Sequence, residues 1–78
     1  MAHVVMYSRP GCGLCDEARA VILAQRSRTP FTFEEVDVSG DHTLELEYGI
    51  RIPVVLVDGR ERFEVRVPVR AFAEALRG

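Results

Sequence analysis

The stretch "YSRPGCGLC", residues 7 to 15, contains both cysteines of the chain, separated by two residues and preceded by a proline and a glycine. Residues 3 to 8 are rich in β-branched and aromatic side chains, which predicts a buried strand that stops at the proline and glycine. Residues 12 to 26 predict an amphipathic helix, because apolar side chains recur there at helical spacing, at Leu14, Ala18, Val21 and Ile22. The two cysteines therefore lie where a strand passes into a helix that opens on Cys12.

The length and charge of the chain limit what it can be. Its 78 residues predict a single small domain, residues 1–78. The formal net charge is −2, from 12 carboxylates and 10 basic residues that are all arginine, so we expect no nucleic-acid partner. No apolar run approaches the ~18 residues of a membrane span, and the first residues lack the features of a signal peptide. We therefore expect no membrane partner, and a cytoplasmic protein whose paired cysteines are catalytic or metal-binding.

The middle of the chain predicts a second strand and a second helix. Residues 31 to 38, "FTFEEVDV", alternate apolar and polar side chains, with a phase change expected at the Glu34-Glu35 pair. Residues 39 to 50 predict a short helix, with Asp41 or Ser39 as its N-cap and Gly49 at the position after its end.

The last third predicts a hairpin and a final helix. Asp58-Gly59 is a strong signal for a type I′ turn, here between strands at 54–57 and 60–66. Pro68 suits the first position of a helix that runs to the end of the chain. The expected order is β-α-β-α-β-β-α. The predicted fold class is α/β, a four-stranded mixed sheet with three helices on both faces.

Cys-x-x-Cys at the end of a first strand, in a chain with this order of elements, resembles the thioredoxin fold in its short, glutaredoxin-like form. "YGIRIPVV", residues 48 to 55, is similar to the family segment with the proline that faces the dithiol, and "VDGRERFEV" is similar to its closing hairpin. The resemblance implies a small thiol–disulfide oxidoreductase with a redox-active disulfide. It also implies a cis Ile52–Pro53 bond, with the Ile52 backbone free to pair with an extended substrate.

The chain departs from the better-known members of this family. Its dithiol loop, Cys-Gly-Leu-Cys, has no proline, and Met6 stands where thioredoxins carry a buried aspartate. The chain has no tryptophan, and "EVRVPVRAF" replaces the glycine turn and aspartate with which glutaredoxins hold glutathione. The reductant therefore stays open between glutathione and a flavoprotein similar to thioredoxin reductase. No bound cofactor is expected.

The position of Cys12 favours a thiolate, because unpaired backbone N–H groups surround the start of a helix. Arg9 adds a nearby cation, whereas Asp16 and Glu17 add negative charge within one turn. The expected mechanism has Cys12 attack a substrate disulfide and Cys15, one turn further into the helix, resolve the mixed disulfide. The residues expected to bind the protein or small-molecule disulfide are Arg9, Pro10, Gly11, Gly13, Leu14, Ile52 and Pro53.

Several other interpretations compete with this one. The cysteines can be small buried residues of a redox-inert interaction module, or ligands of zinc or an iron–sulfur cluster. A metal site needs about four ligands, and we expect the remaining histidines, His3 and His42, to be solvated, so no metal site is predicted within one chain. Arginines late in the chain can bind an anion or, as we expect, alternate with glutamates on a solvated edge strand of a monomer: Arg60, Arg62, Arg66 and Arg70.

Overall fold

A computed structural model describes residues 1–78 and contains the expected seven elements in the expected order. They are β1 (Ala2–Ser8), α1 (Gly13–Arg26), β2 (Phe31–Asp37), α2 (His42–Tyr48), β3 (Val54–Val57), β4 (Arg60–Glu64) and α3 (Val69–Leu76). The strand order is β2-β1-β3-β4. β1 and β2 are parallel, and β3 is antiparallel to both β1 and β4. The mixed four-stranded sheet is therefore confirmed.

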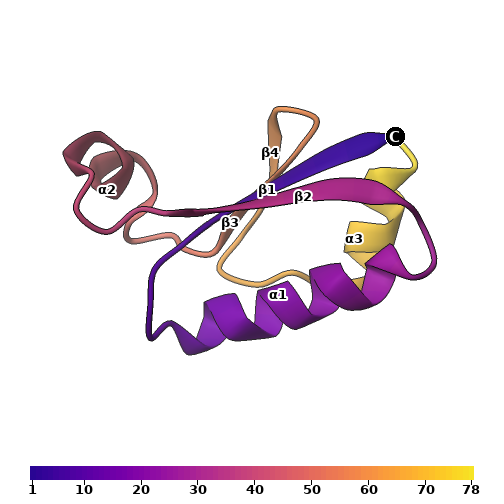
Figure 1. Cartoon of the computed structure of the whole chain (residues 1–78), viewed down its shortest axis with the longest axis horizontal. Coiled ribbons are helices and arrows are strands. Elements are labelled where there is room, and N and C mark those ends of the chain that lie inside the picture. Colours follow the sequence, from indigo (N-terminus) through magenta and orange to yellow (C-terminus); the bar gives the residue numbers. More distant parts are fainter.

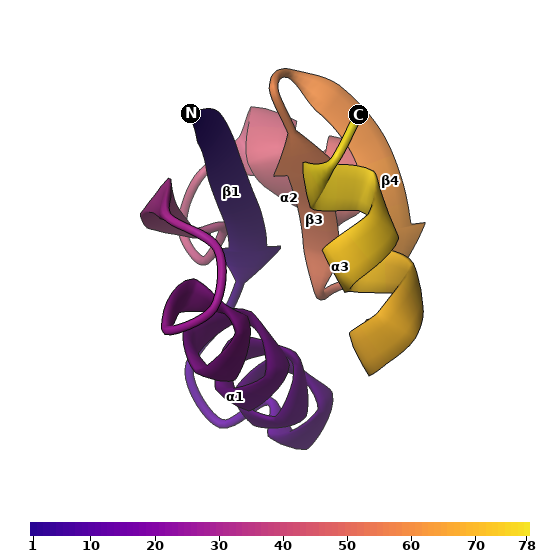
Figure 2. The same cartoon turned by 90° about the vertical axis from the view of Figure 1, so that its right-hand side faces the viewer.

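The main core lies between one face of the sheet and the helices α1 and α3 (Figures 1 and 2). β1 buries alternate residues, Val4 and Met6, and both belong to one cluster with residues of α1, β3 and α3. The cluster members are Val4, Met6, Ala18, Ile22, Phe31, Val55, Val57, Val67, Phe72 and Ala75. Alternation along the strands puts these side chains on one face, so both helices cover that face.

Helix α2 belongs to the opposite face of the sheet. Tyr7 alternates with the buried Met6 and therefore points away from α1, and its ring stacks on that of Tyr48 in α2 at a centroid distance of 4.0 Å. Figure 1 shows α2 at the far end of the sheet from α3. The helices thus lie on both faces, as expected, and α2 sits at the end where β1 runs into the cysteine loop.

The hairpin turn and the N-cap of α2 both have the conformation that their residues predict. Asp58 and Gly59 both have positive φ, 53° and 81°, which is the conformation of a type I′ turn. Asp41, rather than Ser39, caps α2: its carboxylate accepts a hydrogen bond of 3.1 Å from the Leu44 N–H. β4 lies at the edge of the sheet with Arg60 and Arg62 exposed, in agreement with a solvated edge strand.

Some strands and helices begin or end at residues other than those predicted from the sequence. β4 ends at Glu64 rather than at residue 66, because Val65 turns the backbone to a φ of 69°. Pro68 is the N-cap of α3 and not its first helical residue. Gly49 follows the last residue of α2, as expected, and is its C-cap residue with an ordinary helical φ of −51°. None of the helices is long and apolar enough to cross a membrane.

Candidate active site

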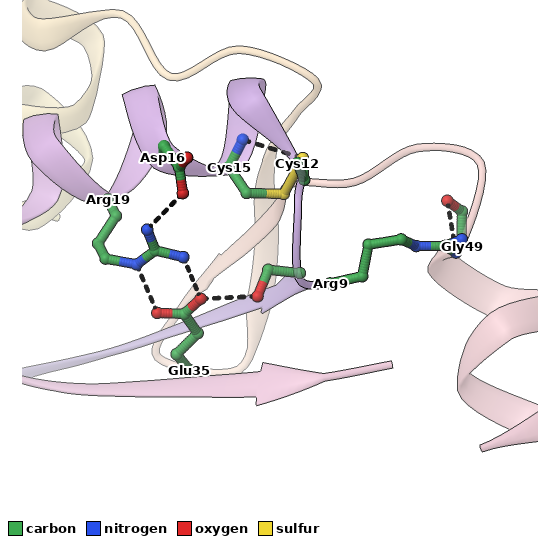
Figure 3. The surroundings of a disulfide bond; sticks show 8 residues. Arg9, Cys12, Cys15, Asp16, Arg19, Glu35 and Gly49 are labelled. Carbon is green, nitrogen blue, oxygen red and sulfur yellow. Dashed lines mark hydrogen bonds and ion pairs between the residues drawn. A yellow bond between two sulfur atoms is a disulfide. The ribbon is translucent and has the colours of Figure 1, made fainter. Parts of the chain in front are cut away.

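The cysteine loop places the two sulfurs at the N-terminus of α1 in different surroundings. Cys12 is the N-cap residue, and its sulfur accepts a hydrogen bond of 3.0 Å from the Cys15 N–H. Cys15 lies in the first turn and has no exposed surface, whereas Cys12 is partly exposed. The two form a disulfide with a Cα–Cα distance of 5.2 Å, inside the range that disulfides use (Figure 3). One sulfur therefore faces solvent and the other is buried behind it.

Arg9 does not direct its charge to the disulfide. Its guanidinium pairs with Glu45 in α2 and donates a hydrogen bond of 3.3 Å to the Gly49 carbonyl oxygen. Figure 3 shows the side chain extending from the loop toward Gly49, away from the sulfurs. The expectation of a cation beside Cys12 is thus wrong, since the carboxylate on α2 attracts the guanidinium. Arg9 instead holds α2 against the cysteine loop.

This contact requires glycine at position 49, and it makes a testable prediction. A Cβ there would lie 2.5 Å from the Glu45 carbonyl oxygen and 3.0 Å from the Arg9 guanidinium. Gly49→Ala should therefore lower the free energy of unfolding by about 1–3 kcal/mol, measured by urea denaturation. Gly13→Ala is the control, because a Cβ at Gly13 meets nothing within 4 Å and should leave stability unchanged or raised. Equal losses in both variants would contradict this account.

A polar network links α1 to the sheet below the disulfide. Both guanidinium edges of Arg19 in α1 are engaged: Nε donates to Glu35 at 2.7 Å and Nη1 to Asp16 at 2.8 Å. The Ser8 hydroxyl, which is buried, donates to the second oxygen of Glu35 at 2.7 Å. Glu35 pairs with Met6 in the parallel register and so shares the face that α1 covers (Figure 3). The network fixes the start of α1 over the ends of β1 and β2.

The burial of β2 changes phase at Glu34-Glu35 as expected, because Phe31 and Phe33 belong to the main core whereas Val38 is fully buried outside that cluster. Sequence reasoning still missed the network, because the strand itself is regular and places the exposed Glu35 on the same face as Met6, where it pairs with Arg19. The strict alternation of positions 31, 33 and 35 was the available signal.

The pKa of Glu35 makes this network pH-dependent. Hydrogen bonds from Arg19 lower the pKa of the Glu35 carboxyl below its ordinary value of 4.5, against the opposing effect of partial burial. A lowered folded-state pKa gives stability that is present above the ordinary pKa and lost as pH falls through the lowered one.

Glu35→Gln should therefore cost about 1–2 kcal/mol of unfolding free energy at neutral pH. The difference from wild type should shrink as the pH drops below 4.5. Urea denaturation across pH measures it. Glu34→Gln is the matched control, since the Glu34 side chain is 61% exposed and meets only His3. A constant difference at every pH would show that the charge of Glu35 is not responsible.

The residues expected to bind substrate do not line one common cavity. Arg9, Pro10 and Gly11 line a polar cavity of about 340 Å³ together with Asp16 and Arg19. Leu14 lines a second, mostly apolar cavity of about 210 Å³ against the segment before α3. Gly13, Ile52 and Pro53 line neither cavity.

The Ile52–Pro53 segment has its own features. The peptide bond between these residues is cis, and Pro53 is fully buried. Neither the N–H nor the carbonyl of Ile52 makes a hydrogen bond within the chain. No group of three or more His, Cys, Asp or Glu side chains is arranged to hold a metal ion.

The fold and the Cys-x-x-Cys disulfide together define a thioredoxin-fold protein of the small, glutaredoxin-like kind. A family model described as the glutaredoxin-like domain (DUF836) matches residues 3–77, and the chain belongs to this family. Uncharacterized proteins of Mycobacterium tuberculosis and Mycobacterium bovis are 35% identical over 64 residues, a match that covers 76% of this chain. The match spans only 66% of the length of each of these relatives.

Solved structures support the same fold. An X-ray structure of the protein XcR50 from X. campestris is 33% identical, with a TM-score of 0.80 and 95% of each chain covered. The solution structure of protein Ne2328 from Nitrosomonas europaea has a TM-score of 0.81, covers 95% of this chain and 89% of its own, and is 24% identical. Fasciola hepatica thioredoxin shares the fold at a TM-score of 0.65 and 22% identity, over 97% of this chain and 78% of its own.

Proposed function

We propose that the chain is a thiol–disulfide oxidoreductase in which Cys12 is the nucleophile and Cys15 the resolving cysteine. The observation that carries the proposal is the asymmetry of the pair at the N-terminus of α1: Cys12 is partly exposed and Cys15 is fully buried, within bonding distance of it. An attacking thiol needs access to a substrate, and a resolving thiol needs only access to the first sulfur.

The reaction exchanges two electrons between two pairs of sulfurs. The Cys12 thiolate attacks one sulfur of the substrate disulfide, so a Cys12–substrate bond forms, the substrate bond breaks and the first substrate thiolate leaves and takes a proton. The Cys15 thiolate then attacks the Cys12 sulfur, which forms the Cys12–Cys15 disulfide and releases the second substrate thiolate. The substrate disulfide is reduced and the protein dithiol is oxidised.

The helix start stabilises the thiolate that this reaction needs. The Cys15 N–H that donates to the Cys12 sulfur at 3.0 Å in the disulfide is placed to donate to the thiolate of the reduced protein. The two nearby carboxylates each have an arginine partner, which offsets part of their repulsion of a thiolate. Asp16 pairs with Arg19 at 2.8 Å and Glu17 with Arg66 at 3.8 Å. The backbone amides are therefore the main stabilising groups for Cys12.

The substrate that we propose is an extended segment of a disulfide-containing protein, or a small disulfide. The unpaired N–H and carbonyl of Ile52 support such a segment, since main-chain groups without partners can add a short stretch of β pairing. The protein acts as a monomer in the cytoplasm and receives its electrons from glutathione or from a flavoprotein reductase.

A disulfide-reduction assay tests the proposal. The reduced protein, in stoichiometric amount, should convert a peptide disulfide to two peptide thiols and end as the Cys12–Cys15 disulfide, seen by chromatography and by thiol counting. Catalytic turnover is then measured with glutathione plus glutathione reductase and, separately, with a thioredoxin reductase. A folded, fully reduced protein that leaves the peptide disulfide intact would overturn the proposal.

A further inference from the structure

The side chain of Arg51, in the segment between α2 and β3, bridges α2 and the edge strand β4. Its Nη2 donates a hydrogen bond of 2.9 Å to the Glu47 carbonyl oxygen in α2. Its Nη1 donates to the Glu61 carboxylate in β4 and lies 3.6 Å from that of Glu64. The guanidinium also lies 5.6 Å from the ring centroid of Tyr48, at the end of α2. A single cation therefore holds the end of α2 to the edge of the sheet.

The backbone of Arg51 is hydrogen-bonded through both of its polar groups. Its N–H donates to the Tyr48 carbonyl at 2.8 Å, and its carbonyl accepts from the Val65 N–H at 3.1 Å. The same Val65 N–H also donates to the Pro53 carbonyl at 2.9 Å. Ile52 lies between these two carbonyls, and its own N–H and carbonyl have no partner within the chain. The position of the Ile52 backbone is therefore set by its neighbours, and Arg51 holds one side of it.

The charges around Arg51 show that it supports the structure and does not bind an anion. Three carboxylates, those of Glu47, Glu61 and Glu64, lie within 3.8 Å of its guanidinium nitrogens. This excess of negative charge repels an anionic ligand. Without the cation, the same carboxylates would repel one another between α2 and β4. Removal of the positive charge should therefore separate the two elements and loosen the segment that joins α2 to β3.

The contacts of Arg51 do not reach the reacting sulfurs. Its side chain bonds to α2 and β4, whereas the Cys12 sulfur accepts its hydrogen bond from the Cys15 N–H. An effect of Arg51 on the reaction must therefore act through the position of Ile52 and not through the reactivity of the thiolate.

We propose that Arg51 is a positioning residue for extended substrates: by holding α2 to β4 it fixes the Ile52 backbone where it pairs with a peptide. The inference rests on the proposed disulfide-reducing function and separates two parts of it. Pairing with Ile52 contributes only to substrates that have a peptide backbone beside the disulfide. Attack by Cys12 takes place on any disulfide that reaches its sulfur. Loss of Arg51 should therefore slow the reduction of peptides and spare small disulfides that have no peptide groups.

A peptide disulfide with extended arms and hydroxyethyl disulfide, which has no peptide groups, test this inference with the reduced protein in single-turnover assays. Arg51→Gln should slow reduction of the peptide about 10-fold, because a backbone that is no longer held in place pairs less well. With the peptide in varied excess, the loss should lie in the half-saturating concentration and not in the limiting rate. The rate with hydroxyethyl disulfide should stay within about twofold of wild type.

Two further variants make the test specific. Arg62→Gln is the matched control, because Arg62 is exposed on the same strand and pairs with none of the three glutamates, and it should behave as wild type. Glu61→Gln removes the partner of Arg51 on β4 and should slow only the peptide, by about 2–3-fold. The double variant Arg51→Gln, Glu61→Gln should be no slower than Arg51→Gln alone, since both changes break the same contact.

The outcomes separate this inference from the proposed function. An unchanged peptide rate in folded Arg51→Gln, or an equal slowing of both disulfides, would overturn the role of Arg51. Additive losses in the double variant would do the same, since Arg51 would then not act through β4. If Arg51→Gln does not fold, Glu61→Gln decides by the same comparison of the two disulfides. Reduction of neither disulfide by folded wild type would instead overturn the proposed function.

Discussion

Cys12→Ser should lower disulfide reduction to the background rate, because serine leaves no thiolate to attack the substrate. Cys15→Ser should keep the first step and lose the second. In that variant Cys12 still attacks, but no second sulfur lies behind it to release the substrate. Mass spectrometry of Cys15→Ser mixed with a peptide disulfide should therefore find one peptide attached to Cys12. Under the same conditions Cys12→Ser should carry no peptide, since its remaining thiol is the fully buried Cys15.

The two serine variants control for one another. Each lacks one thiol and neither can form the internal disulfide, so the loss of the cross-link is common to both variants. Their unfolding should be compared with that of the reduced wild type, which also lacks the cross-link. Activity that persists in Cys12→Ser but disappears in Cys15→Ser would contradict the assigned roles. A reduced wild type that reduces no more peptide disulfide than the two serine variants would identify the chain as a redox-inert module.

Phe72→Ala should have the largest effect on stability. Phe72 in α3 has no exposed surface, and its ring lies 5.8 Å from that of Phe31 and 6.2 Å from that of Phe63. Its truncation removes the side chain that joins α3 to both outer strands of the sheet and costs about 3–5 kcal/mol. A domain of this length has a total stability of only about 4–12 kcal/mol.

Urea denaturation followed by circular dichroism measures this loss, and the transition should move far toward zero denaturant. Val69→Ala is the control on the same helix, since Val69 is 63% exposed and its truncation should change the unfolding free energy by less than about 0.5 kcal/mol. A loss below about 2 kcal/mol in Phe72→Ala would mean that α3 contributes less to the core than its burial indicates.

Much of the fold is predictable because its signals are local. Two residues with positive φ make the hairpin at Asp58-Gly59, and the Asp41 carboxylate caps α2 within its own first turn. The dithiol is equally local, since Cys12 caps the helix that contains Cys15. In each case the interacting residues are close neighbours in the sequence, so residue type and spacing are enough to predict the local structure.

The surroundings of the dithiol depend on contacts between distant residues. The sequence places Arg9 three residues before Cys12 as a nearby cation, but Glu45, 36 residues further along the chain, draws its guanidinium to α2. Glu35 lies at the break in apolar alternation, and it is Arg19 on the facing helix that pairs with its carboxylate. Neither of the two sequence segments that contribute to such an ion pair contains a pattern that predicts it.

The sequence by itself therefore determined the order of the elements, the mixed sheet and the pairing of Cys12 with Cys15 at a helix start. Each of these follows from side-chain periodicity, turn chemistry or short spacing. Only the tertiary structure decided what lies around the disulfide: α2 held by Arg9, the network below α1, and the Arg51 contacts that join α2 to β4. The physical reason is that these features depend on packing between separate elements, where charge compensation and hydrogen bonds across the fold override local preference.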